Sequence, residues 1–100
     1  MYINKCTVKK LIKLGIFNMN ENCYPSNYPD IPELLEKLPY EIKGFGLSIF
    51  KSKNDYTVGY YDTDYIKDEV IVAHKNLAEA LSRLLIRLHK EGLCKNQVDN

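Results

Sequence analysis

The segment NLAEALSRLLIRLHKEG, from Asn76 to Gly92, constrains the fold more than any other part of the chain. Asn76 is a favourable N-cap residue, and a glycine such as Gly92 commonly follows the last turn of a helix. At about 100° per residue, the leucines of this segment fall within about 100° of one another, which predicts an amphipathic helix with one face packed on a sheet. These leucines are Leu77, Leu81, Leu84, Leu85 and Leu88.

The opposite side of this predicted helix is mostly polar. It carries Glu79, Arg83 and Lys90. Ile86 also lies opposite the leucines, so we expect an exposed isoleucine that leaves room for weak self-association.

Three segments before this helix have the residue pattern of β-strands. Phe45, Leu47 and Ile49 alternate with small residues, which predicts a strand with one buried face. The two later segments are rich in β-branched and aromatic residues, which favour strands. The predicted strands cover 45–50, 56–61 and 70–74, with a hairpin turn at 52–55 and an acidic turn at 62–69 between them.

Two short helices are predicted near the N-terminus. Thr7 is a good N-cap and Gly15 a good stop, which predicts a helix of about two turns between them. Asp30 is expected to cap a second helix over 31–38. Between the two helices, residues 18–30 are rich in Tyr, Asn and Pro and are predicted to form a loop.

The order helix, helix, strand, strand, strand, helix predicts an α+β fold. We expect a three-stranded antiparallel β-meander, with the N-terminal short helices and the long C-terminal helix packed on one face. Residues 1–93 would form this single small domain, and residues 94–100 a frayed tail. The other face of the sheet would carry Phe50, Thr57 and Tyr61 and would meet solvent or a partner.

Composition restricts the protein to a few classes. A chain of 100 residues forms one small domain, in which a large enclosed active site is not expected. The net charge of +1 gives no general attraction to nucleic acid or acidic membranes. No apolar run reaches the length of a membrane span, no signal peptide is evident, and the three widely spaced cysteines fit reduced thiols. We therefore expect a cytoplasmic protein without a membrane partner.

No residue pattern predicts catalysis or a cofactor. Cys23, Cys94, His74 and His89 are of metal-ligand type, but none belongs to the local pair that zinc sites commonly use. The acidic run at 62–69 lacks the glycine and glutamate spacing of a calcium loop, so we interpret it as a solvated turn. We expect no enzyme activity, no catalytic residue, no metal and no cofactor.

Tyrosine is frequent in this chain, with eight residues. Tyrosines favour interfaces because the ring buries area while the hydroxyl keeps a hydrogen-bond partner, although an AT-rich genome would also raise their number. The loop residues Tyr24 and Tyr28 either dock back on the domain as a strap, which we favour, or face a partner. The predicted interaction surface consists of Tyr24, Tyr28, Phe50, Tyr61 and Tyr65.

Nucleic-acid binding is the alternative interpretation. Double-stranded RNA-binding domains also run helix, three strands, helix, and they use lysines at the last helix and in a hairpin loop. The corresponding lysines here are Lys51, Lys53 and Lys75. They are few for the electrostatic demand of such binding, and ordinary solvated lysines explain them more simply.

Three segments resemble a pattern found in short uncharacterised proteins of gut bacteria, their prophages and mobile elements. The segments are LIKLGIF (Leu11–Phe17), IPELLEKLPYEI (Ile31–Ile42) and NLAEALSRLLIRLHKEGL (Asn76–Leu93). Arg87 stands where an aromatic residue is often seen in that pattern. The resemblance implies a phage or mobile-element origin and an accessory role, and it carries no catalytic or ligand residues.

The function expected from the sequence is that of a small non-catalytic binding or accessory protein. Its partner would be a host protein, with inhibition of a host defence protein as one form, or a small ligand that it sequesters. A minor double-stranded nucleic-acid-binding module stays the alternative, and a weak homo-oligomer is compatible with either.

Overall fold

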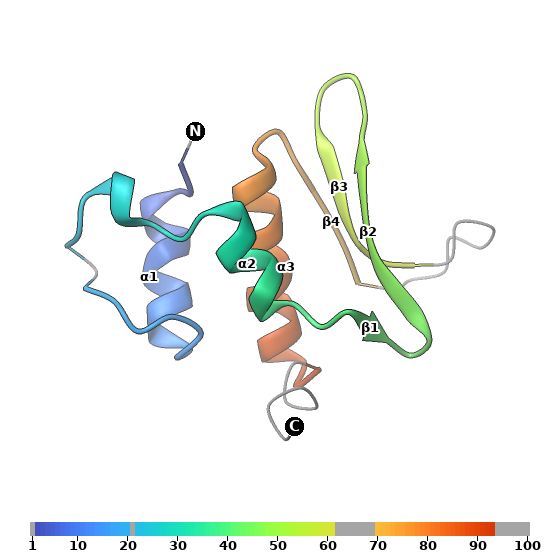
Figure 1. The fold of residues 1–100 in the computed structure, drawn as a ribbon, viewed down its shortest axis with the longest axis horizontal. Helices are drawn as coiled ribbons and strands as arrows, with labels where there is room; N and C mark the ends of the chain where they lie inside the picture. The colour runs from blue at the N-terminus through green and yellow to red at the C-terminus, as the bar shows by residue number, and fades with distance from the viewer. Residues whose placement is uncertain (1, 21, 62–69, 94–100) are drawn as a thin grey trace.

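The computed structural model describes residues 2–20, 22–61 and 70–93. These residues form three α-helices, one short 3-10 helix and a four-stranded sheet (Figure 1). The predicted α+β fold is confirmed, with one strand more than expected. The helices are α1 (Lys5–Lys13), α2 (Ile31–Lys37) and α3 (Leu77–Lys90), with the 3-10 helix η1 at Pro25–Asn27. The strands are β1 (Glu41–Ile42), β2 (Phe45–Lys51), β3 (Tyr56–Tyr60) and β4 (Val70–His74).

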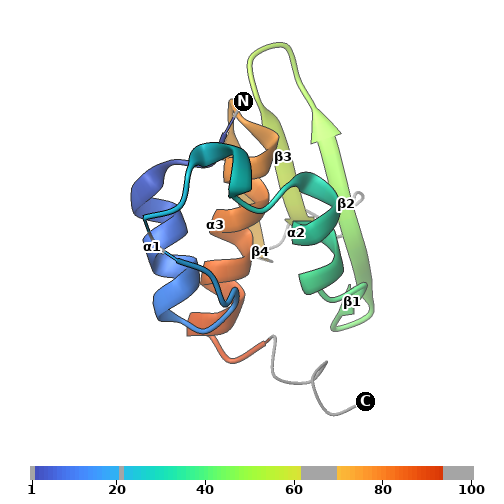
Figure 2. The ribbon, with the colours of Figure 1, turned by 60° about the vertical axis from the view of Figure 1, so that its left-hand side comes forward.

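The sheet is a meander of antiparallel strands in the order β1-β2-β3-β4. The long helix α3 packs on β3 and β4, and both α1 and α2 pack on α3. Figures 1 and 2 show α3 between α1 and the sheet. The helices thus lie on the same side of the sheet, as predicted, and no helix of the described residues covers the other side.

The leucine stripe of α3 forms the centre of the core, as predicted. It belongs to one cluster of buried side chains with Val58 and Tyr60 of β3. The fully buried leucines of α3 are Leu81, Leu84, Leu85 and Leu88. Burial of this stripe on the sheet supplies much of the hydrophobic stabilisation of a small domain.

The opposite side of α3 is partly buried as well, which the helical pattern did not predict. Ile86 is 7% exposed and Glu79 is 2% exposed, because α1 packs on α3 and hydrogen-bonds to Glu79. The expectation of an exposed Ile86 was therefore wrong, and Ile86 offers no surface for self-association. Periodicity within one helix identifies its most apolar face, whereas a second helix can also cover polar groups that have partners.

The helix α1 begins earlier than predicted. Its N-cap is Asn4 rather than Thr7, and the Asn4 side chain accepts a hydrogen bond from the backbone N–H of Cys6 over 2.8 Å. Thr7 lies in the first turn and is buried, with its hydroxyl bonded to Glu79. Both residue types suit an N-cap, and the bond to the buried carboxylate fixes Thr7 inside the helix. Gly15, with φ +76°, follows the end of α1 as predicted.

The helix α2 agrees with its prediction. The Asp30 side chain accepts a hydrogen bond from the N–H of Glu33 over 2.9 Å, and the Glu33 side chain accepts one from the N–H of Asp30 over 3.1 Å. This reciprocal pair is a capping box. After the helix, the buried hydroxyl of Tyr60 donates a hydrogen bond to the Pro39 carbonyl. That bond ties the connection between α2 and β1 to the sheet.

The strand β1 was not predicted. Lys43 and Gly44 have φ angles of +53° and +87°, as in the type I′ turn that closes two-residue hairpins. The turn pairs Ile42 with Phe45 in β2. The sequence signal for this hairpin is weak, because a strand of two residues shows no alternation and lysine is uncommon at positive φ.

Gly59 in β3 is required by the close approach of β4. A Cβ atom at this position would lie 2.1 Å from the carbonyl oxygen of Val70 and 2.9 Å from the Cα of Ile71. Both are backbone atoms of the neighbouring strand, so they could move aside only if the hydrogen bonds between β3 and β4 were disturbed.

Two predicted features fall outside the described residues: the acidic turn at 62–69, which includes Tyr65, and the tail at 94–100, which includes Cys94. Of the other cysteines, Cys6 is exposed and Cys23 is half-buried, both as free thiols. Within the described residues, no helix is both long and apolar enough to cross a membrane.

Candidate functional site

The described members of the predicted interaction surface do not form one patch. Tyr24, just before η1, is 77% exposed. Tyr28 is half-buried and packs against the core, so the loop docks through Tyr28 and presents Tyr24 to solvent. Phe50 lies in β2, and Figure 1 shows η1 and β2 on opposite sides of α3. Tyr24 and Phe50 therefore belong to separate surfaces.

Phe50 lies on the face of the sheet that turns away from the helices. It pairs with Thr57, which pairs with Ala73 across β3, and these residues alternate with the buried Val58. Phe50 is 61% exposed. Tyr61 follows β3 directly and is half-buried. The sequence thus placed Phe50 on the correct face.

The strand β2 has an open edge along its second half. The Leu47 N–H donates to the Tyr40 carbonyl over 3.3 Å, which shows that the Leu47 backbone faces the β1 side. Backbone direction alternates along an antiparallel strand, so the N–H and C=O groups of Ile49 and Lys51 face the same side. The strand β1 pairs only with Phe45 and Gly46 of β2. In the described part of the chain, no strand pairs with Ile49 and Lys51 on this side.

Two large apolar side chains flank the open edge. Ile49 is 44% exposed on the helix side of the sheet, and Phe50 is exposed on the other side. Ile49 was predicted to belong to a buried face together with Phe45 and Leu47, and this was wrong. The reason is tertiary: α3 packs on β3 and β4, and the β2–β3 hairpin extends beyond the helices (Figure 1).

These features define a candidate site, which we call the β2 edge: the backbone of Ile49 and Lys51 with the side chains of Ile49 and Phe50. Unpaired strand edges accept an added strand, because each outward N–H and C=O can hydrogen-bond to it. The Lys51 ammonium lies 5.6 Å from the centre of the Tyr56 ring, which places a positive charge beside the edge. Sequence reasoning found Phe50 but missed the unpaired backbone of Ile49 and Lys51. Whether that backbone is paired depends on the length of β1, which the sequence did not predict.

The lysines of the nucleic-acid alternative lie at one end of the sheet. Lys51 pairs with Tyr56, which pairs with His74, and Lys75 follows directly. Lys53 lies in the hairpin turn at the same end. All three lysines are exposed. Their proximity is compatible with a contact to phosphate groups, and nucleic-acid binding remains a prediction.

Metal-ligand residues are not clustered in the described residues. No group of three His, Cys, Asp or Glu side chains there is arranged to hold a metal ion. The Nδ1 atom of His74 accepts a hydrogen bond from the backbone N–H of Asn76 over 3.0 Å, so this histidine has a local structural partner.

The acid with a shifted pKa among the described residues is Glu79, which lies between α1 and α3. It accepts hydrogen bonds from the Asn4 N–H over 2.7 Å, from the Thr7 hydroxyl over 2.6 Å and from Arg83 Nε over 2.6 Å. Burial by itself would raise the pKa of Glu79. These hydrogen bonds and the Arg83 charge together lower the pKa by a larger amount, so it lies below its ordinary value. A carboxylate held ionised by three donors fastens α1 to α3 and is a poor proton donor.

Comparison with known proteins gives no match to a protein family, to a curated protein or to a solved structure. The function is therefore inferred from the fold and the surface chemistry. The resemblance to phage and mobile-element proteins stays a prediction.

Proposed function

We propose that this chain is a small non-catalytic binding protein that takes up an extended segment of a partner protein along the β2 edge. One observation carries the proposal: the outward backbone groups of Ile49 and Lys51 lie beside two exposed apolar side chains. In strand addition, backbone hydrogen bonds supply affinity and alternate side chains supply specificity. The β2 edge offers both.

The chemistry of the edge indicates which segment would fit. An added strand would place one apolar side chain against Ile49 and the next against Phe50, since successive side chains point to opposite faces. Acidic residues in the segment would meet the exposed Lys51 and Lys53. A second copy of this chain would bring two further lysines to the same short edge, which disfavours self-pairing.

The size of the site indicates a modest affinity. Ile49 and Lys51 offer four backbone groups, and each hydrogen bond contributes about 0.5–1.5 kcal/mol net. Burial of Phe50 and Ile49 adds about 1.5–3 kcal/mol each, against several kcal/mol for ordering the partner segment. A dissociation constant on the order of micromolar follows from these terms.

The biological setting is a further part of the proposal. The resemblance to phage and mobile-element proteins and the reduced-thiol pattern support a cytoplasmic accessory protein. A host protein, including a component of a defence system, is then the natural source of the bound segment. Sequestration of a small ligand and binding of duplex nucleic acid through Lys51, Lys53 and Lys75 are the competing functions.

Selection of linear peptides from a random display library tests the proposal without a known partner. We expect enriched peptides with alternating apolar residues and acidic flanks. Phe50→Ala should raise the dissociation constant of a selected peptide about tenfold or more. Tyr24→Ala removes an aromatic ring that is even more exposed, on the other surface, and should change this dissociation constant less than about twofold.

A backbone-specific pair of variants tests strand addition itself. Lys51→Pro removes one N–H that faces the β2 edge and spares those that bond to β3, and proline is tolerated on edge strands. Lys51→Gln keeps that N–H and removes only the charge. We expect Lys51→Pro to weaken peptide binding more than Lys51→Gln, with both variants folded by circular dichroism. Equal effects of the two variants, or a dimer in sedimentation that Ile49→Lys dissociates, would overturn the proposal.

A further inference from the structure

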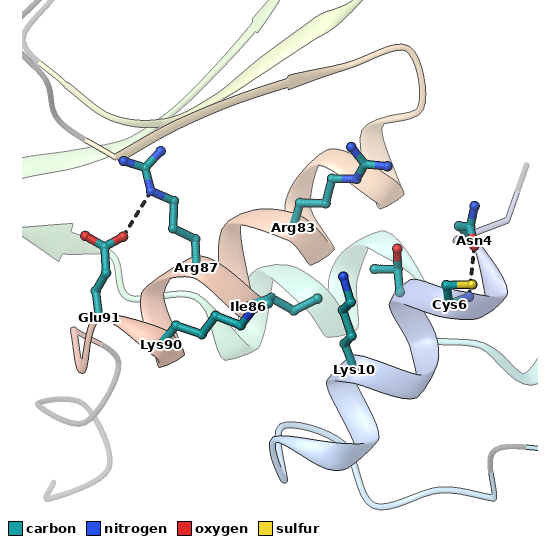
Figure 3. A pocket seen from close by; sticks show the side chains of 9 residues that line it. Asn4, Cys6, Lys10, Arg83, Ile86, Arg87, Lys90 and Glu91 are labelled. Atoms are coloured by element: carbon teal, nitrogen blue, oxygen red, sulfur yellow. Dashed lines mark hydrogen bonds and ion pairs between the residues drawn. The ribbon is translucent and has the colours of Figure 1, made fainter.

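A hollow lies between α1 and α3, on the side of α3 that carries Glu79. Its volume is about 680 Å³, within the range of about 300–1,000 Å³ that small-ligand sites occupy. Figure 3 shows Lys10 rising from α1 toward α3, with Arg83, Arg87 and Lys90 along α3. We call this hollow the α1–α3 groove, and its principal lining residues are Lys10, Arg83, Ile86, Arg87, Lys90 and Glu91.

The α1–α3 groove is basic in a chain that is almost neutral. Four basic side chains line it, and Glu91 is the acidic residue among the lining residues. The buried Glu79 beneath Arg83 adds a second carboxylate. The groove therefore keeps an excess of positive charge, whereas the net charge of the whole chain is +1. A local excess of this kind attracts anions, and concave surroundings strengthen its field.

The two arginines are held in fixed orientations. Arg83 Nε donates to Glu79 Oε2 over 2.6 Å. Arg87 Nε donates to Glu91 Oε2 over 3.0 Å, and Arg87 Nη1 donates to the Ile71 carbonyl over 3.1 Å. Within the described residues, the terminal nitrogens of Arg83 have no further partner. Arg83, fixed through Nε, therefore keeps its outer N–H groups for a bidentate contact with an oxyanion, whereas one outer nitrogen of Arg87 is bonded to Ile71.

The frame around the groove is rigid as well. The bonds from Asn4 and Thr7 to Glu79 fix α1 against α3, and the buried Ile86 contributes to the wall. These bonds hold the helix that carries Lys10 against the helix that carries Arg83 and Lys90. A site that is formed before binding loses less entropy when the ligand arrives.

We propose that the α1–α3 groove binds a diphosphate group, as the free ion or as part of a small organic molecule, with one phosphate on Arg83 and Lys10 and the other near Arg87 and Lys90. A phosphate presents several oxygens to a guanidinium fork, whereas a carboxylate presents two. Cations contributed by two helices suit a ligand with two anionic groups. The site is separate from the β2 edge and does not depend on the function proposed for it.

Calorimetric titration with inorganic pyrophosphate, ADP, citrate and adenosine tests this site in the full chain. We expect heat of binding with pyrophosphate and ADP that weakens as salt is raised. Citrate should bind at least about tenfold more weakly, and adenosine should not bind. Tighter binding of ADP than of pyrophosphate would identify an organic diphosphate, and equal binding would identify the diphosphate group alone as the determinant.

Variants locate the binding in the α1–α3 groove. Lys10→Gln and Lys90→Gln should each raise the dissociation constant about tenfold, the usual effect of one lost charge-assisted hydrogen bond. Neither lysine bonds to Glu79, so both variants should keep the fold. Lys53→Gln, at the distant hairpin, is the matched control and should have no effect. The proposal is overturned by an absence of heat at low salt, by equal binding of citrate, by an equal effect of Lys53→Gln, or by preferential binding of duplex RNA.

Discussion

The hydroxyl of Thr7 donates a hydrogen bond to Oε2 of Glu79 over 2.6 Å, which joins the first turn of α1 to the first turn of α3. Asn76, the N-cap of α3, adds a second link at the same end, since its side-chain amide donates to the Tyr2 carbonyl over 2.8 Å. The N-terminal segment is therefore fastened to the last helix by polar bonds in addition to apolar contacts. The position of α1, and with it the shape of the α1–α3 groove, depends on these bonds.

Replacement of Thr7 by valine should destabilise the fold. Thr7→Val keeps the shape of the side chain and removes a donor to a buried carboxylate, which we expect to cost about 1–3 kcal/mol. Urea denaturation followed by circular dichroism measures the loss. Thr57→Val, in a half-buried strand position, is the control and should change stability by less than about 0.5 kcal/mol. Equal stability of Thr7→Val and the parent chain would contradict the role given to this bond.

Low pH should remove the contribution of ionised Glu79 to the stability of the fold. Its folded pKa lies below the ordinary value of 4.5, so the ionised carboxylate stabilises the fold at any pH above that value. The contribution is lost as the pH falls through the folded pKa, because the proton then binds in both states. Melting temperatures of the parent chain and of Glu79→Gln, taken from about pH 7 to about pH 3, should therefore converge at the acid end. A gap that widens toward low pH would refute the assignment.

Two glycines of the sheet should respond differently to alanine. Gly59→Ala should cost about 3 kcal/mol or prevent folding, because its Cβ would meet the Val70 carbonyl at 2.1 Å. Gly46→Ala is the matched control, since its Cβ would lie at an ordinary contact distance of 3.7 Å from the Tyr40 carbonyl oxygen. The unfolding free energy of this variant should stay within about 1 kcal/mol of that of the parent chain. Similar unfolding free energies for the two variants would show that β3 and β4 are not in such close contact.

Two cross-strand partners on the helix side of the sheet should also lose different amounts of stability when each is replaced by threonine. Ile49 pairs with Val58, yet Ile49 is partly exposed whereas Val58 is completely buried. Val58→Thr buries a hydroxyl and should cost about 1–3 kcal/mol. Ile49→Thr keeps its hydroxyl in water and should cost less than about 1 kcal/mol. If denaturation gave the larger loss for Ile49→Thr, the β2 edge would be covered in solution.

Local chemistry explains which parts of the fold could be predicted. Asn76, Asp30 and Gly15 act on their own helix ends, so their roles follow from residue type and position. The leucine stripe of α3 and the alternation in β2 likewise depend on neighbours close in sequence. These signals were sufficient for the α+β fold and the order of its main elements.

The remaining features depend on contacts between distant segments. Glu79 and Ile86 are buried by α1, whose Thr7 lies 72 positions before Glu79 in the sequence. Ile49 is exposed because α3 packs on β3 and β4 and does not cover it, and its backbone is unpaired because β1 pairs only with Phe45 and Gly46. Lys43 at positive φ gave no clear turn signal. Both candidate sites depend on such contacts. Sequence reasoning identified Phe50 of the β2 edge, gave Lys51 only as an alternative nucleic-acid contact, and assigned no residue of the α1–α3 groove to a site.

Amide hydrogen exchange along β2 tests the central proposal most directly. In the free protein, the amides of Ser48 and Phe50 should be protected by their bonds to β3, whereas those of Ile49 and Lys51 should exchange rapidly at the open edge. Addition of a selected peptide should slow exchange at Ile49 and Lys51. Peptide binding that leaves these two amides in rapid exchange would contradict strand addition at the β2 edge.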